Sequence, residues 1–190
     1  MANKIILVSG GSRSGKSLWA EKLVRAYGGK AAYLATSLVE DEEMARRVAS
    51  HRARRPLDVW DNYEAPQAAA DSLIALKSAG YHAVLFDCLT VYVSNCLFRL
   101  AALPPAEKEA AVLAEVQGML TAAQALPCPV VFVTSEVGAG IVPMEPLTRE
   151  FRDCIGLVNQ TVAAAAEAVW LVSCGLALDL KRYGESVGME

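Results

Sequence analysis

Short apolar runs alternate with longer amphipathic stretches along this chain. The apolar runs predict strands at residues 5–9, 31–35, 83–87, 130–134 and 168–172. The amphipathic stretches predict helices at residues 16–27, 41–54, 66–79, 90–100, 106–125 and 147–166. Strands that alternate with helices are typical of an α/β fold, in which helices cover both faces of a mostly parallel sheet.

The end of the chain departs from this alternation. The last apolar stretch, residues 176–180, follows the strand predicted at 168–172 after only Ser173, Cys174 and Gly175. Because a crossover between parallel strands needs a longer connection, we expect an antiparallel hairpin at one edge of the sheet. No repeat, linker or low-complexity segment divides the sequence, so we expect one domain over residues 1–190 with a frayed tail at 183–190.

A glycine-rich segment joins the first predicted strand to the first predicted helix. It has the pattern G-x-x-x-x-G-K-S of a nucleotide-binding P-loop and comprises Gly10, Gly11, Ser12, Arg13, Ser14, Gly15, Lys16 and Ser17. In such a loop, backbone N–H groups and the helix N-terminus surround a phosphate chain. Lys16 then reaches the β- and γ-phosphates, and Ser17 ligates Mg²⁺. We therefore expect a three-layer P-loop NTPase fold of the RecA-like type.

The carboxyl ends of the predicted strands locate the other candidate residues. In open parallel sheets, ligands bind beyond these ends, which brings together the P-loop and residues 35–37, 87–88, 135–136 and 173–175. Asp87 directly follows an apolar run, where P-loop enzymes place the carboxylate that holds Mg²⁺ directly or through water. The alternative is that Asp87 caps the helix that follows it.

The second predicted helix is acidic at its start and basic at its end. This order suits the helix dipole, and pairs of opposite charge four residues apart favour a solvated helix. Such a helix does not account for His51, which stands among Arg47, Arg52, Arg54 and Arg55. Arginines without local acidic partners form an anion site, and their charge favours the neutral, nucleophilic imidazole. His51 is therefore a candidate nucleophile for attack on phosphorus.

The segment 134–143 also lies at the end of a predicted strand. It contains Gly138, Gly140 and Pro143, so its backbone conformation is special. Its position at the ligand edge favours contact with a substrate, although a plain connection between strand and helix is the alternative.

Composition and charge narrow the class of protein. The chain has 190 residues and a formal net charge of −3, which argues against broad nucleic-acid binding. No apolar run is long enough to span a membrane, and the start of the chain lacks signal-peptide features, so we expect a cytoplasmic protein. The five cysteines form no C-x-x-C pair and indicate buried reduced thiols, and only two histidines argue against a zinc site.

Several segments recur in the order and spacing of one enzyme family. They are the P-loop, the segment 41–48 followed by His51-Arg52 and Arg55-Pro56, the loop 136–143, and the segments 149–153 and 158–160. Together they closely resemble the bifunctional adenosylcobinamide kinase/adenosylcobinamide-phosphate guanylyltransferase family of cobalamin biosynthesis. The resemblance extends from Ile5 to about Lys181.

The resemblance implies two reactions in one site. The first moves the γ-phosphoryl group of ATP or GTP to the aminopropanol hydroxyl of adenosylcobinamide. The second moves GMP from GTP to adenosylcobinamide phosphate through a GMP–histidine intermediate. It releases pyrophosphate and gives adenosylcobinamide-GDP.

The resemblance also assigns residues and partners. It makes His51 the guanylylated histidine, catalytic together with Lys16 of the P-loop. The implied nucleotide contacts beyond the P-loop are Leu34, Ala35, Thr36, Arg52, Ala53, Arg54, Arg55, Glu64 and Asp87. Ser17 and Asp87 are expected to hold Mg²⁺ with ATP or GTP, and no tightly bound organic cofactor is expected. The family further implies a homotrimer.

Other functions share part of this pattern. A P-loop kinase with one activity on another small metabolite would use Lys16 and Asp87 but form no covalent nucleotide. A RecA-like ATPase acting on nucleic acid would need a basic surface, which the net charge of −3 disfavours. A GTP-binding switch is disfavoured because the sequence has no N-K-x-D segment to bind guanine.

Overall fold

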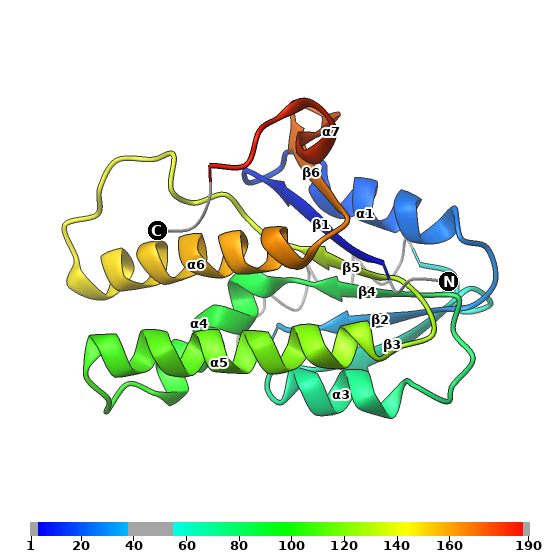
Figure 1. Cartoon of the computed structure of the whole chain (residues 1–190), viewed down its shortest axis with the longest axis horizontal. Helices are drawn as coiled ribbons and strands as arrows, with labels where there is room; N and C mark the ends of the chain where they lie inside the picture. The colour runs from blue at the N-terminus through cyan, green and yellow to red at the C-terminus, as the bar shows by residue number, and fades with distance from the viewer. Residues whose placement is uncertain (1–3, 38–54, 188–190) are drawn as a thin grey trace.

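A seven-stranded sheet runs through the computed structural model, which describes residues 4–37 and 55–187 (Figure 1). The spatial order of its strands is β3-β2-β4-β5-β1-β6-β7. All neighbouring strands are parallel except β6 and β7, which pair antiparallel. The strands are β1 (Ile5–Gly10), β2 (Ala31–Ala35), β3 (Trp60–Glu64), β4 (Ala83–Asp87), β5 (Val130–Val133), β6 (Ala168–Ser173) and β7 (Leu176–Asp179). The parallel sheet and its antiparallel edge hairpin confirm the predicted fold class.

Helices cover both faces of this sheet, as the layers in Figure 1 show. One face carries α1 (Lys16–Arg25), and the other carries α3 (Ala69–Ala75), α4 (Leu89–Arg99), α5 (Pro105–Gln124) and α6 (Pro146–Ala165). These helices lie where the sequence predicts them, although α3 is shorter than the predicted 66–79. The helix predicted at 41–54 lies outside the described residues. None of the described helices is long and apolar enough to cross a membrane.

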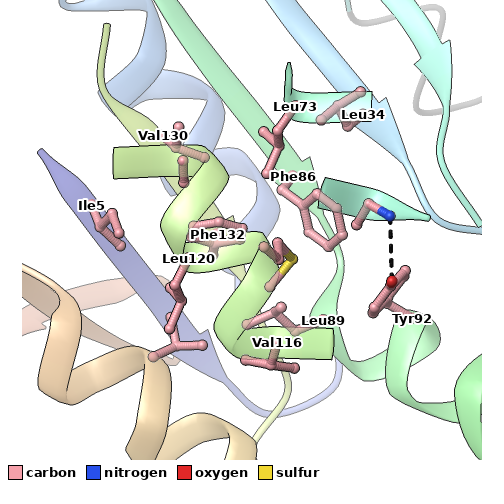
Figure 2. Packing of buried hydrophobic residues seen from close by; sticks show 14 of the residues in the cluster. Ile5, Leu34, Leu73, Phe86, Leu89, Tyr92, Val116, Leu120, Val130 and Phe132 are labelled. Carbon is pink, nitrogen blue, oxygen red and sulfur yellow. Dashed lines mark hydrogen bonds between the residues drawn. The ribbon is translucent and has the colours of Figure 1, made fainter. Parts of the chain in front are cut away.

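The larger of two apolar cores lies between the sheet and helices α3 to α6. Phe86 of β4 and Phe132 of β5 meet there with ring centroids 5.4 Å apart, and Leu120 of α5 belongs to the same buried cluster (Figure 2). Leu85 and Val133 of the same strands belong to a second core, on the side of α1. Because these strands are buried on both faces, they need apolar residues at consecutive positions, which produces the uninterrupted apolar runs of the sequence.

The sequence did not predict strand β3, because four of its five residues are polar or amphipathic. This strand forms one edge of the sheet and pairs only with β2. Trp60 anchors it, since this buried side chain packs edge-on against Tyr33 with ring centroids 6.4 Å apart. Asp61 Oδ2 forms a salt bridge with Lys30 Nζ at 2.8 Å and accepts a hydrogen bond from the Tyr81 hydroxyl at 2.6 Å. An edge strand tolerates charged residues, which also oppose pairing with other chains.

A single helical turn, α7 (Leu180–Tyr183), follows the antiparallel hairpin. The Asp179 carboxylate caps this turn by accepting hydrogen bonds from the backbone N–H groups of Lys181 at 3.1 Å and Arg182 at 3.3 Å. The tail predicted to fray starts at the last residue of this turn, and residues 184–187 have no regular secondary structure.

Candidate active site

The P-loop connects the end of β1 to the start of α1. Gly10 admits no side chain, since a Cβ there would lie 2.3 Å from the carbonyl oxygen of Val172. Arg13 and Gly15 adopt left-handed conformations, with φ of 57° and 99°, and so tighten the loop. The Lys16 ammonium donates to the carbonyl oxygen of Gly11 at 3.0 Å. The loop thus has the compact form and the inward cation that phosphate binding requires.

Asp87 lies at the carboxyl end of β4, close to this lysine. Its Oδ2 accepts a hydrogen bond from the Tyr33 hydroxyl at 3.1 Å. Burial and the Asp87 charge raise the pKa of the neighbouring Cys88 thiol to about 11, although the Lys16 charge opposes them. Helix α1, which begins at Lys16, packs against β4, which ends at Asp87. The structure therefore brings Lys16 and Asp87 to one site.

Arg55 packs over the ring of Tyr33 and is only 3% exposed. Its guanidinium carbon lies 3.2 Å from the centroid of the Tyr33 ring, in a cation–π contact. Burial and the charge of Asp87 raise the pKa of Tyr33 above its usual value, although Arg55 opposes them. Tyr33 therefore stays protonated and donates to Asp87. The other predicted members of this basic cluster, His51, Arg52, Ala53 and Arg54, lie outside the described residues.

The register of the sheet aligns three predicted contacts. Ala35 is paired with Glu64 of β3 on one side and with Asp87 of β4 on the other. All three therefore end parallel strands at the edge where the P-loop opens. Leu34 precedes them, and its side chain is buried in the larger core, so only its main chain is available to a ligand at this edge.

Thr36 has a positioning role that the sequence did not reveal. Its fully buried hydroxyl donates to the carbonyl oxygen of Cys88 at 2.9 Å and accepts from the N–H of Cys88 at 2.8 Å. The amide of Asn95 in α4 donates to the carbonyl oxygens of Thr36 at 2.9 Å and Pro66 at 3.0 Å. These contacts join the chain segments that follow β2, β3 and β4. They fix the position of the peptide that carries Asp87.

A second buried network holds the chain after β5. The Thr134 hydroxyl donates to Asn159 Oδ1 of α6 at 2.6 Å and lies 3.4 Å from the Thr90 hydroxyl of α4. The Ser135 N–H donates to the same Thr90 hydroxyl at 2.7 Å. Sequence reasoning singled out Thr134 and Ser135 only as members of a loop and missed Thr90. The network ties α4 and α6 to the ligand edge.

The loop after Thr134 lies beside the P-loop, where the sequence predicts a substrate-contacting segment. The Glu136 N–H donates to the carbonyl oxygen of Gly10 at 3.2 Å. Farther along, the loop exposes Ile141, Val142 and Met144 to solvent. Exposed apolar side chains gathered in one short loop are typical of a surface that contacts another molecule.

Magnesium fits the donors at this edge. Mg²⁺ prefers oxygen ligands and in phosphate-binding sites takes one or two carboxylates together with substrate phosphates and water. Asp87 supplies a carboxylate and Ser17 a hydroxyl at the first turn of α1. Within residues 4–37 and 55–187 no group of three or more His, Cys, Asp or Glu side chains forms a metal cage. A site shared with nucleotide phosphates is thus the arrangement that these residues support.

A comparison with solved structures concerns the fold. The crystal structure of the RadB recombinase aligns with a TM-score of 0.51 and 18% sequence identity, and the alignment covers 88% of this chain and 73% of that chain. This likeness confirms the predicted RecA-like P-loop fold. At this identity it carries no information on function.

Comparisons of sequence identify the family. Residues 6–180 match the family model described as cobinamide kinase/cobinamide phosphate guanyltransferase. The bifunctional adenosylcobalamin biosynthesis protein CobU of Escherichia coli is 43% identical over 183 residues, with 93% of this chain and 99% of that protein covered, and CobU of Salmonella typhimurium gives the same values. The corresponding CobP protein of Pseudomonas aeruginosa is 37% identical over 175 residues, with 92% and 96% covered. The chain therefore belongs to the cobinamide kinase/cobinamide phosphate guanyltransferase family.

Proposed function

We propose that this protein phosphorylates the aminopropanol hydroxyl of adenosylcobinamide and then transfers GMP from GTP to the resulting phosphate. The observation that carries the proposal is the grouping of Lys16, Asp87 and Arg55 around Tyr33 and Cys88 at one edge of the sheet. The family membership and the names of the relatives, which describe both reactions or the pathway, support the same pair of activities.

In the kinase step, the residues of the P-loop bind and orient the triphosphate. Backbone N–H groups of residues 10–17 hold the phosphates, and Lys16 leaves the Gly11 carbonyl to neutralise charge on the β- and γ-phosphates. The acceptor hydroxyl attacks the γ-phosphorus, the bond to the β-phosphate oxygen breaks, and the nucleoside diphosphate leaves. Ser17 and Asp87 would hold Mg²⁺, which would supply further positive charge to the phosphates. Tyr33 keeps Asp87 oriented through its hydrogen bond.

In the guanylyl step, His51 attacks the α-phosphorus of GTP and pyrophosphate leaves, which forms a phosphoramidate. An oxygen of adenosylcobinamide phosphate then attacks the same phosphorus, and the imidazole leaves. His51 lies four residues before Arg55 in the sequence, and Arg55 contacts Tyr33, which donates a hydrogen bond to Asp87; this placement of Arg55 supports the role of His51. Arg52, Ala53, Arg54, Arg55 and the Leu34–Thr36 segment with Glu64 are proposed nucleotide contacts.

The acceptor and the assembly complete the proposal. A corrinoid is large and partly apolar, and Ile141, Val142 and Met144 offer an exposed apolar surface on the loop that starts beside the P-loop. The protein is proposed to act in the cytoplasm as a homotrimer made of single domains of residues 1–190. Sedimentation equilibrium of the full chain measures this, and a monomeric mass at micromolar concentration would contradict the trimer.

Incubation with α-labelled GTP, followed by denaturing electrophoresis, tests the guanylyl step. The wild-type chain should retain label that is lost in acid and stable in base, since a phosphoramidate has this stability. His51→Ala should lose the label and the guanylyl transfer, yet keep most of the kinase turnover, because the γ-phosphoryl group passes directly to the acceptor. His82→Ala is the matched control, since His82 is the only other histidine. It directly precedes β4, at the end of the strands opposite to the P-loop.

Two outcomes would favour other functions. Kinase turnover without any covalent label would indicate a kinase with one activity. Tight retention of single-stranded DNA in a filter-binding assay, without phosphorylation of cobinamide, would indicate a RecA-like ATPase.

A further inference from the structure

The turn between β6 and β7 packs directly on the P-loop. The Gly175 N–H donates to the carbonyl oxygen of Ser14 at 3.0 Å. A Cβ placed on Gly15 would lie 3.7 Å from the Cα of Gly175, so the two glycines are in close contact. The proposed kinase and guanylyl steps give no role to this turn.

The order of the strands determines which end of the nucleotide faces this turn. Lys16 and Asp87 mark the reacting end of the phosphate chain, because Lys16 would reach the β- and γ-phosphates and Asp87 would hold the Mg²⁺ that accompanies them. Asp87 belongs to β4, which is separated from β1 by β5. Strand β6 adjoins β1 on the opposite side. A phosphate chain with its γ end toward β4 therefore directs its nucleoside toward β6 and the turn.

An exposed apolar side chain lies close to this contact. Leu18, three residues after Gly15 in the first turn of α1, is 60% exposed. Ser173 and Cys174 of the turn are exposed as well. An apolar side chain beside a polar turn suits a purine, which has apolar faces and hydrogen-bonding edges.

We infer that the β6–β7 turn, with Leu18, contacts the purine nucleoside of the triphosphate used in the kinase step. This inference rests on the proposed kinase function. It makes Leu18 a binding residue and gives the turn a role in nucleotide affinity. It leaves the β2–β3–β4 side of the P-loop to the acceptor of the kinase step, to the chemistry at Asp87 and to the GTP contacts proposed for the guanylyl step.

The cysteines of the chain provide a direct test. All five are described by the structure, and Cys174 is the exposed one, whereas Cys88 is half-buried and Cys96, Cys128 and Cys154 are buried. Alkylation of Cys174 is followed by mass spectrometry with Mg²⁺ and either a non-hydrolysable ATP analogue or tripolyphosphate. At a ligand concentration ten times Kd about one-eleventh of the protein is free, so the ATP analogue should slow alkylation about tenfold. Tripolyphosphate fills only the phosphate positions and should slow it less than about twofold. Cys174→Ser identifies the labelled site.

Each other outcome overturns the inference. Equal protection by both ligands means that the turn responds to phosphates alone. Unchanged alkylation while equilibrium dialysis measures bound ATP analogue places the nucleoside elsewhere and leaves the kinase proposal intact. If dialysis detects no binding of the analogue, the kinase proposal fails with it.

A pair of matched variants measures the apolar contact separately. Leu18→Ser should weaken binding of the ATP analogue about three- to tenfold, since it removes apolar area from the contact, and should leave tripolyphosphate binding unchanged. Ile74→Ser is the control, because Ile74 is 56% exposed on α3, which covers the other face of the sheet. Equal affinities of the wild-type and the Leu18→Ser variant for the ATP analogue would contradict the inference.

Discussion

The two sides of the P-loop are held in place by different kinds of contact. On the β4–β5 side, buried side chains form hydrogen bonds across several elements, as Thr36 does with Cys88 and Thr134 does with Asn159. On the β6–β7 side, the contacts are between backbones, as between Gly175 and Ser14, and the nearby side chains are exposed. The first arrangement fixes the carboxylate and the loops that carry chemistry. The second supports the loop and leaves side chains available to a ligand.

This difference predicts that substitutions on the two sides change different measurements. Changes at the centre and on the β4–β5 side should lower turnover or stability, because they disturb charges and buried hydrogen bonds. Changes on the β6–β7 side should act mainly on nucleotide affinity.

Lys16→Ala should have the largest effect, because it removes the cation that both reactions require at the phosphates. The loss of one such group costs about 4 kcal/mol of transition-state stabilisation, so kcat for the kinase step should fall about 1000-fold. Steady-state assays measure this, and an unchanged melting temperature shows that the fold is retained. Wild-type turnover by a folded Lys16→Ala protein would remove the P-loop from the mechanism.

Asp87→Asn should come next, with a fall in kcat of about 100-fold and a shift of the magnesium titration to higher concentrations. Asparagine keeps an oxygen that can accept the hydrogen bond from Tyr33, so the local structure should persist. Tyr33→Phe is the matched control, since it removes that hydrogen bond and keeps the carboxylate. The structure gives α4 the N-cap residue Cys88 and no side-chain cap, so the alternative role of Asp87 as a helix cap is wrong. If Asp87→Asn leaves the magnesium titration unchanged, Asp87 is a structural partner of Tyr33 and does not hold the metal.

The sequence predicted the P-loop side of this site better than the residues that support it. The P-loop is continuous from Gly10 to Ser17, and its residue types carry the chemistry wherever the fold places them. Thr36 and Asn95 are 59 positions apart, and their hydrogen bond follows from the sheet order, which a single sequence does not provide. Strand β3 was missed because Trp60 alone anchors a polar edge strand. The family resemblance therefore implied both Glu64 and Ala35, but the sequence did not predict that they pair in neighbouring strands.

Thr134→Val should reduce stability more than turnover. Valine has the same shape, but it leaves Asn159 Oδ1 without its buried donor and removes the hydroxyl beside Thr90, which costs about 1–3 kcal/mol of the free energy of unfolding. Urea unfolding should give a lower midpoint with an unchanged slope. Thr121→Val is the control, because Thr121 bonds only within α5 at an exposed position and should change the free energy by less than about 0.5 kcal/mol. Equal losses in both variants would show that the Thr134 network does not stabilise the ligand edge.

Gly175→Ala should have the smallest effect, and it tests the β6–β7 side directly. Gly175 has φ of 78° and open space around its missing Cβ, so alanine costs about 1 kcal/mol of backbone strain without a steric clash. Gly80 is closely matched, with φ of 75° and the same open space around its missing Cβ. It lies before β4, at the end of the strands opposite to the P-loop. Both variants should therefore lose similar stability in urea.

Only Gly175→Ala should raise KM for ATP, about two- to fivefold, because only that strain shifts the turn against Ser14. A similar rise of KM in Gly80→Ala would indicate a general loosening of the fold, and no rise in either variant would mean that the position of the turn does not influence nucleotide binding.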